Sequence, residues 1–193
     1  MATTALRSKV TEAISEAVFA ELAECGYTGL SMEAIARRAG VGKAALYRRW
    51  PSKLEMITEL VRQAVERTLP SVPDTGALHT DLREYLTTLR GQLADPVANR
   101  IGPGLIAEAR RTDALGEALR QGVAAPRRAV ARAVLQAAID RGELPAELDF
   151  ELASDLLIAP LGFRILITGD RHDDAYLDTL TTAIEAALKA AVR

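Results

Sequence analysis

The chain is short of the residues on which most catalytic, metal-binding and disulfide-stabilised proteins depend. Among its 193 residues there are one cysteine and two histidines, and aromatic residues make up only 4% of the sequence. Cys25 alone cannot form an intrachain disulfide, which fits a reducing cytoplasm. His79 and His172 are isolated and no Glu-x-x-His pair is present, so no catalytic constellation is recognisable. We therefore expect no enzymatic activity, no metal and no cofactor.

Long apolar runs and strand patterns are also missing. The longest apolar run, Leu156 to Phe163, is far shorter than the ~20 residues that a membrane-spanning helix needs. No charged segment followed by an apolar one opens the chain, so we expect no signal peptide, no membrane partner and a soluble cytoplasmic protein. Because alanine, leucine and arginine are abundant and alternating β-branched runs are absent, the sequence predicts an all-α fold.

The most informative stretch is SMEAIARRAGVGKAALYRRWPSK, from Ser31 to Lys53. Ser31 is a good N-cap, and apolar residues at helical spacing follow it. The segment Gly40-Val41-Gly42 interrupts this pattern, because glycine adopts positive φ at no steric cost. A second short helix, Lys43 to about Arg49, ends at Pro51. Two short helices joined by such a turn predict a helix-turn-helix.

The same stretch carries an uneven charge. The whole chain has a formal net charge of -2, yet no aspartate or glutamate lies between residues 37 and 53. Leu46 and Trp50 are the expected buried anchors of the second helix. A local concentration of positive charge is the electrostatic footprint of a phosphate-binding surface. The basic residues of this segment are Arg37, Arg38, Lys43, Arg48, Arg49 and Lys53.

From Gly26 to Ile57 the sequence resembles the DNA-binding domain of the tetracycline-repressor (TetR) family of regulators. The residues that carry the resemblance are Gly26 and Tyr27 at the end of the first helix, Ser31 at the start of the second, Ile35-Ala36 and Ala39-Gly40-Val41 in the core and turn, Leu46-Tyr47 on the recognition helix, and Lys53 at the start of the fourth. This motif covers about the first quarter to third of the chain. The rest resembles the family's ligand and dimer domain more loosely.

The resemblance implies that Lys43 and Ala44 face base edges in the major groove, where a lysine can donate to guanine O6 and N7. It implies phosphate contacts from Ser31, Tyr47 and Lys53. Ala45 departs from the family, which usually carries threonine or serine there, so affinity must depend more on the arginines. The predicted DNA-binding residues are, in full, Ser31, Gly42, Lys43, Ala44, Tyr47, Arg48, Arg49 and Lys53.

Helices are also expected before and after this motif. A first helix runs from about Leu6 to Glu24 and ends at Gly26, and a fourth runs from Ser52 to about Thr68. The proline- and glycine-bearing segment Leu69 to Gly76 is the best boundary in the chain. We therefore predict a DNA-binding domain over 1–51, a connecting helix and linker over 52–76, and an effector-binding and dimerisation domain over 77–193. The core stripe of the first helix is Val10, Ile14, Val18 and Leu22.

The remainder is expected to be a helical bundle, which brings the total to about nine helices. Gly102-Pro103-Gly104 should break or sharply kink a helix over 97–111, either opening a cavity wall or forming a plain loop. The family resemblance implies a pocket for a small hydrophobic effector in this bundle. Its predicted lining consists of apolar residues near the kink and on the facing helices, namely Tyr85, Leu89, Leu105, Ile106 and Phe163.

The segment from Phe150 to about Thr168 is apolar nearly all round and must be covered on both sides. A second copy of the same helix is the simplest cover on one side. Together with a last amphipathic helix capped by Asp173 or Asp174, it would form a four-helix interface across a two-fold axis. The predicted homodimer interface is Leu156, Leu157, Phe163, Arg164, Ile167, Tyr176, Leu180, Ile184 and Leu188.

Three polar features each allow two interpretations. Arg164, a charge inside an apolar helix, is a counter-ion for an acidic effector or, as we favour, a snorkelling or interface side chain. His172 lies among three aspartates in GDRHDD, where a helix cap is favoured over a metal site. A second basic cluster is interpreted as a solvated helix face in preference to a second nucleic-acid site. Its members are Arg127, Arg128, Arg132 and Arg141.

Together these features predict a dimeric regulator that binds a palindromic operator in double-stranded DNA, with its two recognition helices ~34–36 Å apart. The resemblance implies repression that is relieved by a small molecule. An enzyme built on a helical bundle lacks its catalytic residues in this sequence. A helical protein-protein adaptor that has lost specific DNA binding is the remaining alternative, and only Ala45 points to it.

Overall fold

The computed structural model describes residues 2–69 and 71–191, with side chains from Val10 onward. Every regular element in these ranges is a helix, as the composition predicted. Ten α-helical segments, α1 to α10, are present there, and α7 continues through a π-helical turn into α8. When α1 is counted as one helix and each π-helical turn is counted with its neighbours, the described residues contain nine helices, which agrees with the expected number.

The chain divides into two compact units, which we call the head and the body. The head comprises residues 1–67 and 100–123, and the body comprises residues 68–99 and 124–193. This division differs from the predicted limits, because residues 100–123 belong to the head and not to a continuous domain over 77–193. The functional division into DNA-binding, connecting and effector-binding segments stays a prediction.

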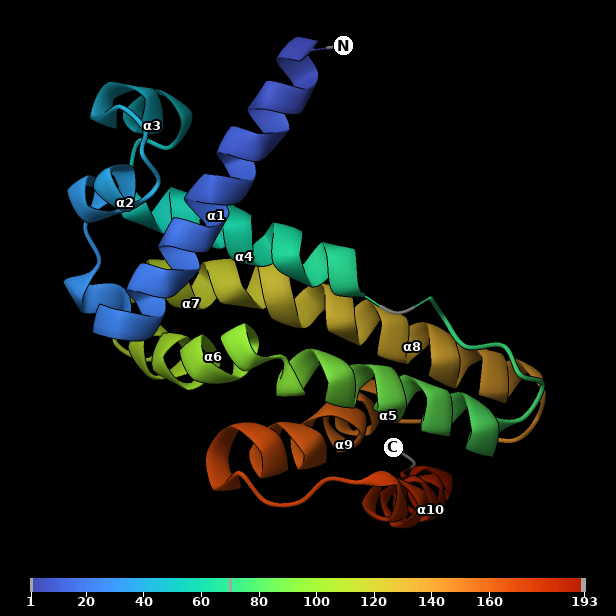
Figure 1. Cartoon of the computed structure of the whole chain (residues 1–193). Coiled ribbons are helices and arrows are strands. Elements are labelled where there is room, and N and C mark those ends of the chain that lie inside the picture. Colours follow the sequence, from blue (N-terminus) through green and yellow to red (C-terminus); the bar gives the residue numbers. More distant parts are fainter. Residues whose placement is uncertain (1, 70, 192–193) are drawn as a thin grey trace. The chain divides into compact units, whose positions relative to one another are not determined.

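The head is built around α1, with α2 and α3 beside it (Figure 1). Gly26, with φ of 67°, interrupts the helical backbone where the sequence places the end of the first helix. Ile14, Val18 and Leu22 of the predicted stripe are buried, but Val10 is 40% exposed. The elements of the head are α1 (Ala2–Gly29), α2 (Met32–Arg38), α3 (Lys43–Arg49), α4 (Lys53–Thr68), the second part of α6 (Pro96–Ala109), α7 (Asp113–Leu119) and most of the π-helical turn η1 (Arg120–Ala124).

One hydrophobic core joins the helix-turn-helix to the inserted segment. Leu46 and Trp50 share this core with Ile101, Leu105 and Leu115, which come from residues 100–123. Sequence reasoning assigned Leu105 to an effector pocket, but its side chain is 5% exposed and packs in the head.

The expected break at Gly102-Pro103-Gly104 is absent from the structure. The α6 helix runs unbroken from Pro96 to Ala109 with Pro103 inside it. Proline removes only one backbone hydrogen bond, and neither flanking glycine takes a positive φ. Burial of Ile101 and Leu105 on the two sides of the proline offsets that loss. The prediction of a break or a plain loop at this segment is therefore wrong.

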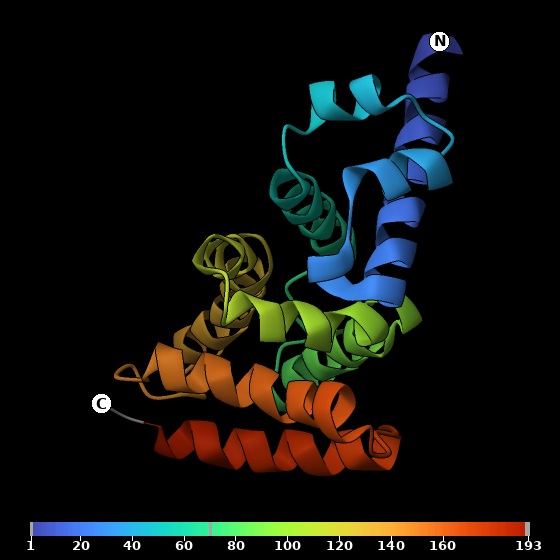
Figure 2. The same cartoon turned by 90° about the vertical axis from the view of Figure 1, so that its left-hand side faces the viewer.

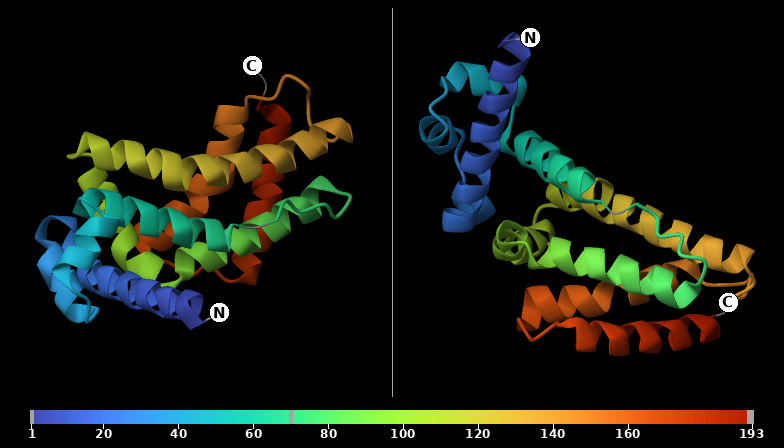
Figure 3. Two further views of the ribbon diagram at one scale, coloured as in Figure 1. Left: turned by 90° about the horizontal axis from the view of Figure 1, so that it is seen from above. Right: turned by 45° about the vertical axis from the view of Figure 1, so that its right-hand side comes forward.

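In the body, α5 is the central helix. It contacts α8, α9 and α10, and Figure 3 shows it between α8 and the last two helices. Its apolar residues from Leu78 to Leu93, which recur at helical spacing, are buried. The elements of the body are α5 (Leu78–Ala94), α8 (Ala125–Asp140), α9 (Phe150–Phe163), the π-helical turn η2 (Arg164–Thr168) and α10 (Asp174–Ala190).

A buried carboxylate ties the start of α5 to the end of α8. Asp81 is fully buried and accepts hydrogen bonds from the backbone N–H of Thr75 and from Arg141 Nη2, both at 2.7 Å. Burial alone would raise the pKa of this carboxyl, but the hydrogen bonds from Thr75 and Arg141 together lower it. Because the folded state favours the ionised form, Asp81 stabilises the fold at neutral pH, and this contribution is lost as the pH falls through the folded-state pKa.

We predict that Asp81→Asn lowers the free energy of unfolding by about 2 kcal/mol at pH 7, since the amide presents a donor to Arg141. Urea unfolding followed by circular dichroism measures this difference, which should shrink below about pH 4, the range where free aspartate is protonated. Asp178→Asn is the matched control, because the Asp178 carboxylate pairs with Arg83 on the surface, where ion pairs contribute little. A difference that persists undiminished at pH 3 would contradict the assignment.

Candidate functional site

The turn before α3 is formed as the sequence predicted. Ser31 caps α2, with its Oγ accepting a hydrogen bond from the Ala34 backbone N–H at 3.1 Å. Gly40 takes a φ of 66°, the left-handed conformation that favours glycine. Gly42, which is exposed, is the N-cap residue of α3. Two consecutive short helices are thereby joined by a tight glycine-bearing turn, as in a helix-turn-helix.

The inner face of α3 is firmly anchored. Leu46 and Trp50 are each 1% exposed. The Trp50 indole Nε1 donates to Glu59 Oε2 on α4 at 2.9 Å. Anchoring these positions leaves the opposite face of α3 in solvent, where Lys43, Ala44 and Tyr47 are exposed.

Lys43 forms an ion pair with Glu33 of α2 and lies 5.7 Å from the centre of the Tyr47 ring. The hydrogen bond to Glu33 raises the pKa of Lys43 and keeps its ammonium charged at neutral pH. Sequence reasoning did not foresee Glu33, although it stands in the first turn of the helix before the turn. Lys43 and Glu33 are both more than half exposed, so the pair is easily replaced by another partner.

The two arginines at the end of α3 differ in their surroundings. Arg49 donates from Nη1 to Thr11 Oγ1 at 2.7 Å, and its guanidinium lies 4.4 Å from the Trp50 ring. Arg48 is exposed and has no hydrogen-bond or ion-pair partner among the described residues. Arg48 is thus the cation of the recognition helix that is most available to a phosphate.

Two of the predicted basic residues serve the fold of the head. Lys53 Nζ donates to the carbonyl oxygen of Tyr27 at 3.0 Å and lies 4.7 Å from the Tyr27 ring. Arg38 pairs with Glu21 at 2.8 Å and with Glu24 at 2.5 Å, which neutralises its charge. These partners come from α1 and its end, far away in sequence, so the charge pattern gave no sign of them.

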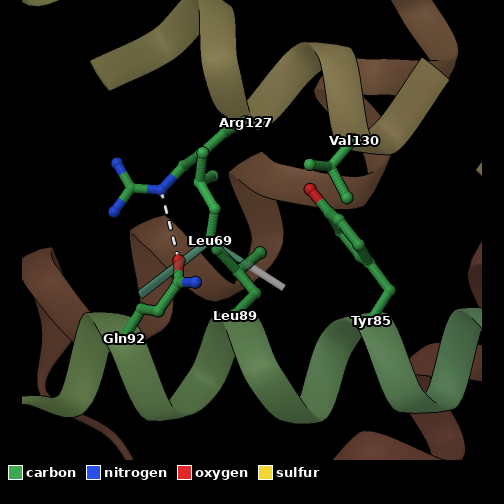
Figure 4. A pocket seen from close by; sticks show the side chains of 6 residues that line it. All are labelled: Leu69, Tyr85, Leu89, Gln92, Arg127 and Val130. Carbon is green, nitrogen blue, oxygen red and sulfur yellow. Dashed lines mark hydrogen bonds between the residues drawn. The ribbon is translucent and has the colours of Figure 1, made fainter. Parts of the chain in front are cut away.

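The body contains a small pocket between α5 and α8 (Figure 4). It measures about 190 Å³, including its opening to solvent. Burial raises the pKa of the Tyr85 hydroxyl to about 12 and lowers that of the Arg127 guanidinium. The lining residues are Leu69, Tyr85, Leu89, Gln92, Arg127 and Val130.

Two of the five predicted pocket residues, Tyr85 and Leu89, line this pocket. Leu105 lies in the core of the head, Ile106 is 51% exposed and Phe163 is 62% exposed, and none of these three lines this pocket. Arg127 was interpreted as part of a solvated face, but it lies in the register of the buried residues Ala131, Val134 and Ala138. That spacing was the signal that sequence reasoning overlooked.

Apart from Arg164, the predicted interface residues fall into three groups by their exposure. Leu157, Ile184 and Leu188 are at most 3% exposed within a single subunit, so they belong to its own core and cannot contact a partner directly. Phe163 and Ile167 are strongly exposed, whereas Leu156, Tyr176 and Leu180 are partly buried. Figure 2 shows α9 and α10 side by side along this part of the body.

Arg164 is satisfied within its own chain. Its Nε donates to the carbonyl oxygen of Arg171 at 2.5 Å, and its guanidinium lies 4.1 Å from the Tyr176 ring. In the loop that follows, Asp173 caps α10 by accepting from the Tyr176 N–H at 3.0 Å, as the sequence predicted. The remaining basic residues of the second cluster also have partners: Arg128 pairs with Asp155, Arg132 stacks on Phe150 and Arg141 pairs with Asp81.

Comparison with known proteins decides the family. Residues 14–60 match the family model of bacterial regulatory proteins of the tetR family, and residues 72–184 match that of the tetracyclin repressor-like C-terminal domain. The chain belongs to the TetR family. Members of this family are DNA-binding transcriptional regulators, which are not enzymes, and they function as dimers.

Individual relatives of this TetR-family chain agree with the assignment. It is 34% identical over 169 residues to an uncharacterised helix-turn-helix transcriptional regulator, YdeS, of Bacillus subtilis, covering 88% of this chain and 84% of that one. It is 32% identical over 155 residues to the DNA-binding transcriptional repressor TetR of Mycobacteroides abscessus, covering 80% of each. The crystal structure of the TetR family regulator SCO0332 aligns with a TM-score of 0.70 and 32% identity, covering 92% of this chain and 97% of that one.

In the part of the chain that the structure describes, no helix is long and apolar enough to cross a membrane.

Proposed function

We propose that this TetR-family regulator is a homodimeric repressor that binds a palindromic operator and is released by a small molecule bound in the body. The observation that carries the DNA-binding part is the exposed face of α3, with Lys43, Tyr47 and Arg48 in solvent on a helix anchored by Leu46 and Trp50. Two such helices, ~34–36 Å apart, would enter successive major grooves on one face of the duplex.

We assign two different roles to the exposed residues of α3, which are reading the base sequence and positioning the head on the phosphates. We assign base readout to Lys43, which can leave the exposed Glu33 carboxylate and donate to guanine O6 and N7. Arg48, Arg49 and Tyr47 would contact phosphates and fix the register of the head without reading sequence. Ser31 and Lys53 would support them mainly by holding the turn between α1 and α2.

An exposed apolar stripe supports the homodimer. Leu152, Phe163 and Ile167 are each at least 50% exposed and lie on one side of the continuous helix formed by α9 and η2. Exposed apolar residues that cluster along one helix face mark a protein-protein contact. The outer face of α10 beside it carries small residues, Ala183 and Ala186, over which a second copy of this helix pair could pack closely.

Repression and release rest on two further observations. A relative that is 32% identical over most of both chains is a transcriptional repressor. The side chains that line the pocket leave almost no free volume between them, so an effector has to move the walls apart. One wall residue, Leu69, directly follows α4, through which such a movement would reach the recognition helix and shift the protein toward a non-binding conformation.

The test of the proposed function is selection of bound sequences from a random pool of duplex DNA with the purified full-length protein. We expect a palindrome to be enriched and to be bound by two chains. Binding without any enriched sequence would overturn the proposal and favour the adaptor alternative.

We predict that Lys43→Ala changes which bases are enriched at one position of each half-site, with a loss of about tenfold in affinity for the original palindrome. Repeating the selection with the variant measures the change. Arg48→Ala is the comparison, because loss of a phosphate contact should weaken all sequences about equally and leave the consensus unchanged. If both variants enrich the original palindrome and lose affinity uniformly, Lys43 does not read bases.

A further inference from the structure

Arg127 stands apart from the other arginines of the body that the structure describes. Each of the others faces a carboxylate or an aromatic ring, whereas the one hydrogen bond of the Arg127 side chain is a long contact of 3.5 Å from Nε to Gln92 Oε1. The arginines with carboxylate partners are Arg83, Arg90, Arg128, Arg141 and Arg171, and those that stack on rings are Arg132 and Arg164.

The apolar surroundings of Arg127 make the lack of a counter-charge energetically unfavourable. Its side chain extends from α8 toward Gln92 of α5, with Leu69 and Leu89 beside it, while Val130 and Tyr85 lie on the other side of the pocket (Figure 4). A guanidinium is charged at every physiological pH and carries five N–H donors. Burial without a counter-charge destabilises the charged form, in line with the lowered pKa of this group. The pocket thus presents a guanidinium that pairs with no carboxylate among the described residues.

Two further polar groups at the pocket narrow the chemistry of an occupant. The Tyr85 hydroxyl lies at the pocket and has no hydrogen-bond partner among the described residues, although the residue is only 2% exposed. The Gln92 side-chain Nε2 donates to the carbonyl oxygen of Thr68, which leaves its Oε1 as the acceptor facing Arg127. The groups of the pocket that can still form hydrogen bonds are therefore mainly donors, namely the Arg127 guanidinium and the Tyr85 hydroxyl.

We propose that this pocket takes a small organic anion, with a carboxylate held by the Arg127 guanidinium and an apolar body packed against Leu69, Leu89 and Val130. A carboxylate matches the planar donor fork of arginine better than a spherical ion does. The inference refines the proposed function, on which it rests, by giving the effector a charge that the family resemblance did not suggest.

The test is calorimetric titration of the full-length protein with octanoate and with phenylacetate, each compared with its neutral amide, and with acetate and inorganic phosphate as anions lacking an apolar body. We expect at least one of the two carboxylates to bind tenfold or more tightly than its amide, acetate or phosphate. Equal affinity for carboxylate and amide, tightest binding of phosphate, or no binding of either carboxylate would overturn the inference.

Variants of Arg127 provide the second part of the test. Arg127→Met should lower carboxylate affinity at least tenfold and leave amide affinity within twofold. It should also raise the melting temperature of the empty protein by about 2–4 °C, because an uncompensated charge is replaced by an apolar side chain of similar length. Arg128→Met, which removes a surface arginine paired with Asp155, is the control and should do neither. Unchanged carboxylate affinity in Arg127→Met would overturn the inference, and Arg127→Gln repeats the test if the first variant folds poorly.

Operator binding measured in parallel separates this inference from the proposed function. If carboxylates bind through Arg127 but leave operator affinity unchanged, the pocket chemistry stands and effector-released repression fails. If the operator is bound specifically but no carboxylate preference is found, the pocket chemistry fails and the DNA-binding function stands.

Discussion

Raising the salt concentration from about 50 mM to about 200 mM is expected to weaken operator binding about a hundredfold. The expected size follows from the two cations of α3 that we assign to phosphates in each subunit, Arg48 and Arg49, and hence four in a dimer. Each cation that neutralises a phosphate releases condensed counter-ions, so the logarithm of the affinity falls linearly with the logarithm of the salt concentration. Fluorescence anisotropy of a labelled operator across a salt series measures the slope.

The same series identifies the contribution of Arg48, the residue with no partner in the described part of the free protein. Arg48→Gln removes one contact from each subunit and should reduce the slope by about 2. Arg120→Gln removes an arginine that pairs with Glu117 away from α3 and should leave the slope unchanged. A slope that is the same in Arg48→Gln and wild type would show that Arg48 does not contact a phosphate.

Leu46→Ala is expected to lower the free energy of unfolding of the head by about 3 kcal/mol and to abolish specific DNA binding. Leu46 is 1% exposed, and truncation of a buried leucine leaves a cavity in addition to removing apolar contacts. Trp50, the single tryptophan of the chain, lies in the same core, so its fluorescence during urea unfolding reports on the head directly.

Val10→Ala is the control for this measurement. Val10 belongs to the apolar stripe that the sequence predicts for the first helix, yet it is 40% exposed. We expect a change of at most about 0.5 kcal/mol, as is usual for surface positions. If Val10→Ala destabilises the head as much as Leu46→Ala does, the packing described for the head is incorrect.

What the sequence predicted well was local. The cap at Ser31, the turn at Gly40 and the buried positions Leu46 and Trp50 depend on residues within one or two helical turns of each other, and all were confirmed. The apolar residues of α5 from Leu78 to Leu93 recur at helical spacing, and these are the residues that the structure buries. Periodicity cannot tell how far a core extends, however, which explains why it placed Val10 inside.

What the sequence could not provide depends on contacts between distant residues. The Lys53 ammonium meets the carbonyl oxygen of Tyr27, and Arg38 meets Glu21 and Glu24. With Lys43 on Glu33 and Arg49 on Thr11, four of the six predicted cations of the head already have partners in the fold. Leu105 packs in the head because residues 100–123 pack there, which no local pattern indicates. The pocket formed by Tyr85 and Arg127 likewise joins helices that are some forty residues apart in the chain.

The exposed apolar stripe of Leu152, Phe163 and Ile167 affects how operator occupancy depends on the amount of protein in the cell. If two chains must join along it before they hold a palindrome, operator occupancy follows the concentration of the dimer and not that of the chain. Where most chains are monomeric, halving the supply of chains lowers the amount of dimer about fourfold. A modest change in synthesis or degradation would then produce a disproportionate change in how many operators are occupied, which gives the regulator a threshold before any effector is bound.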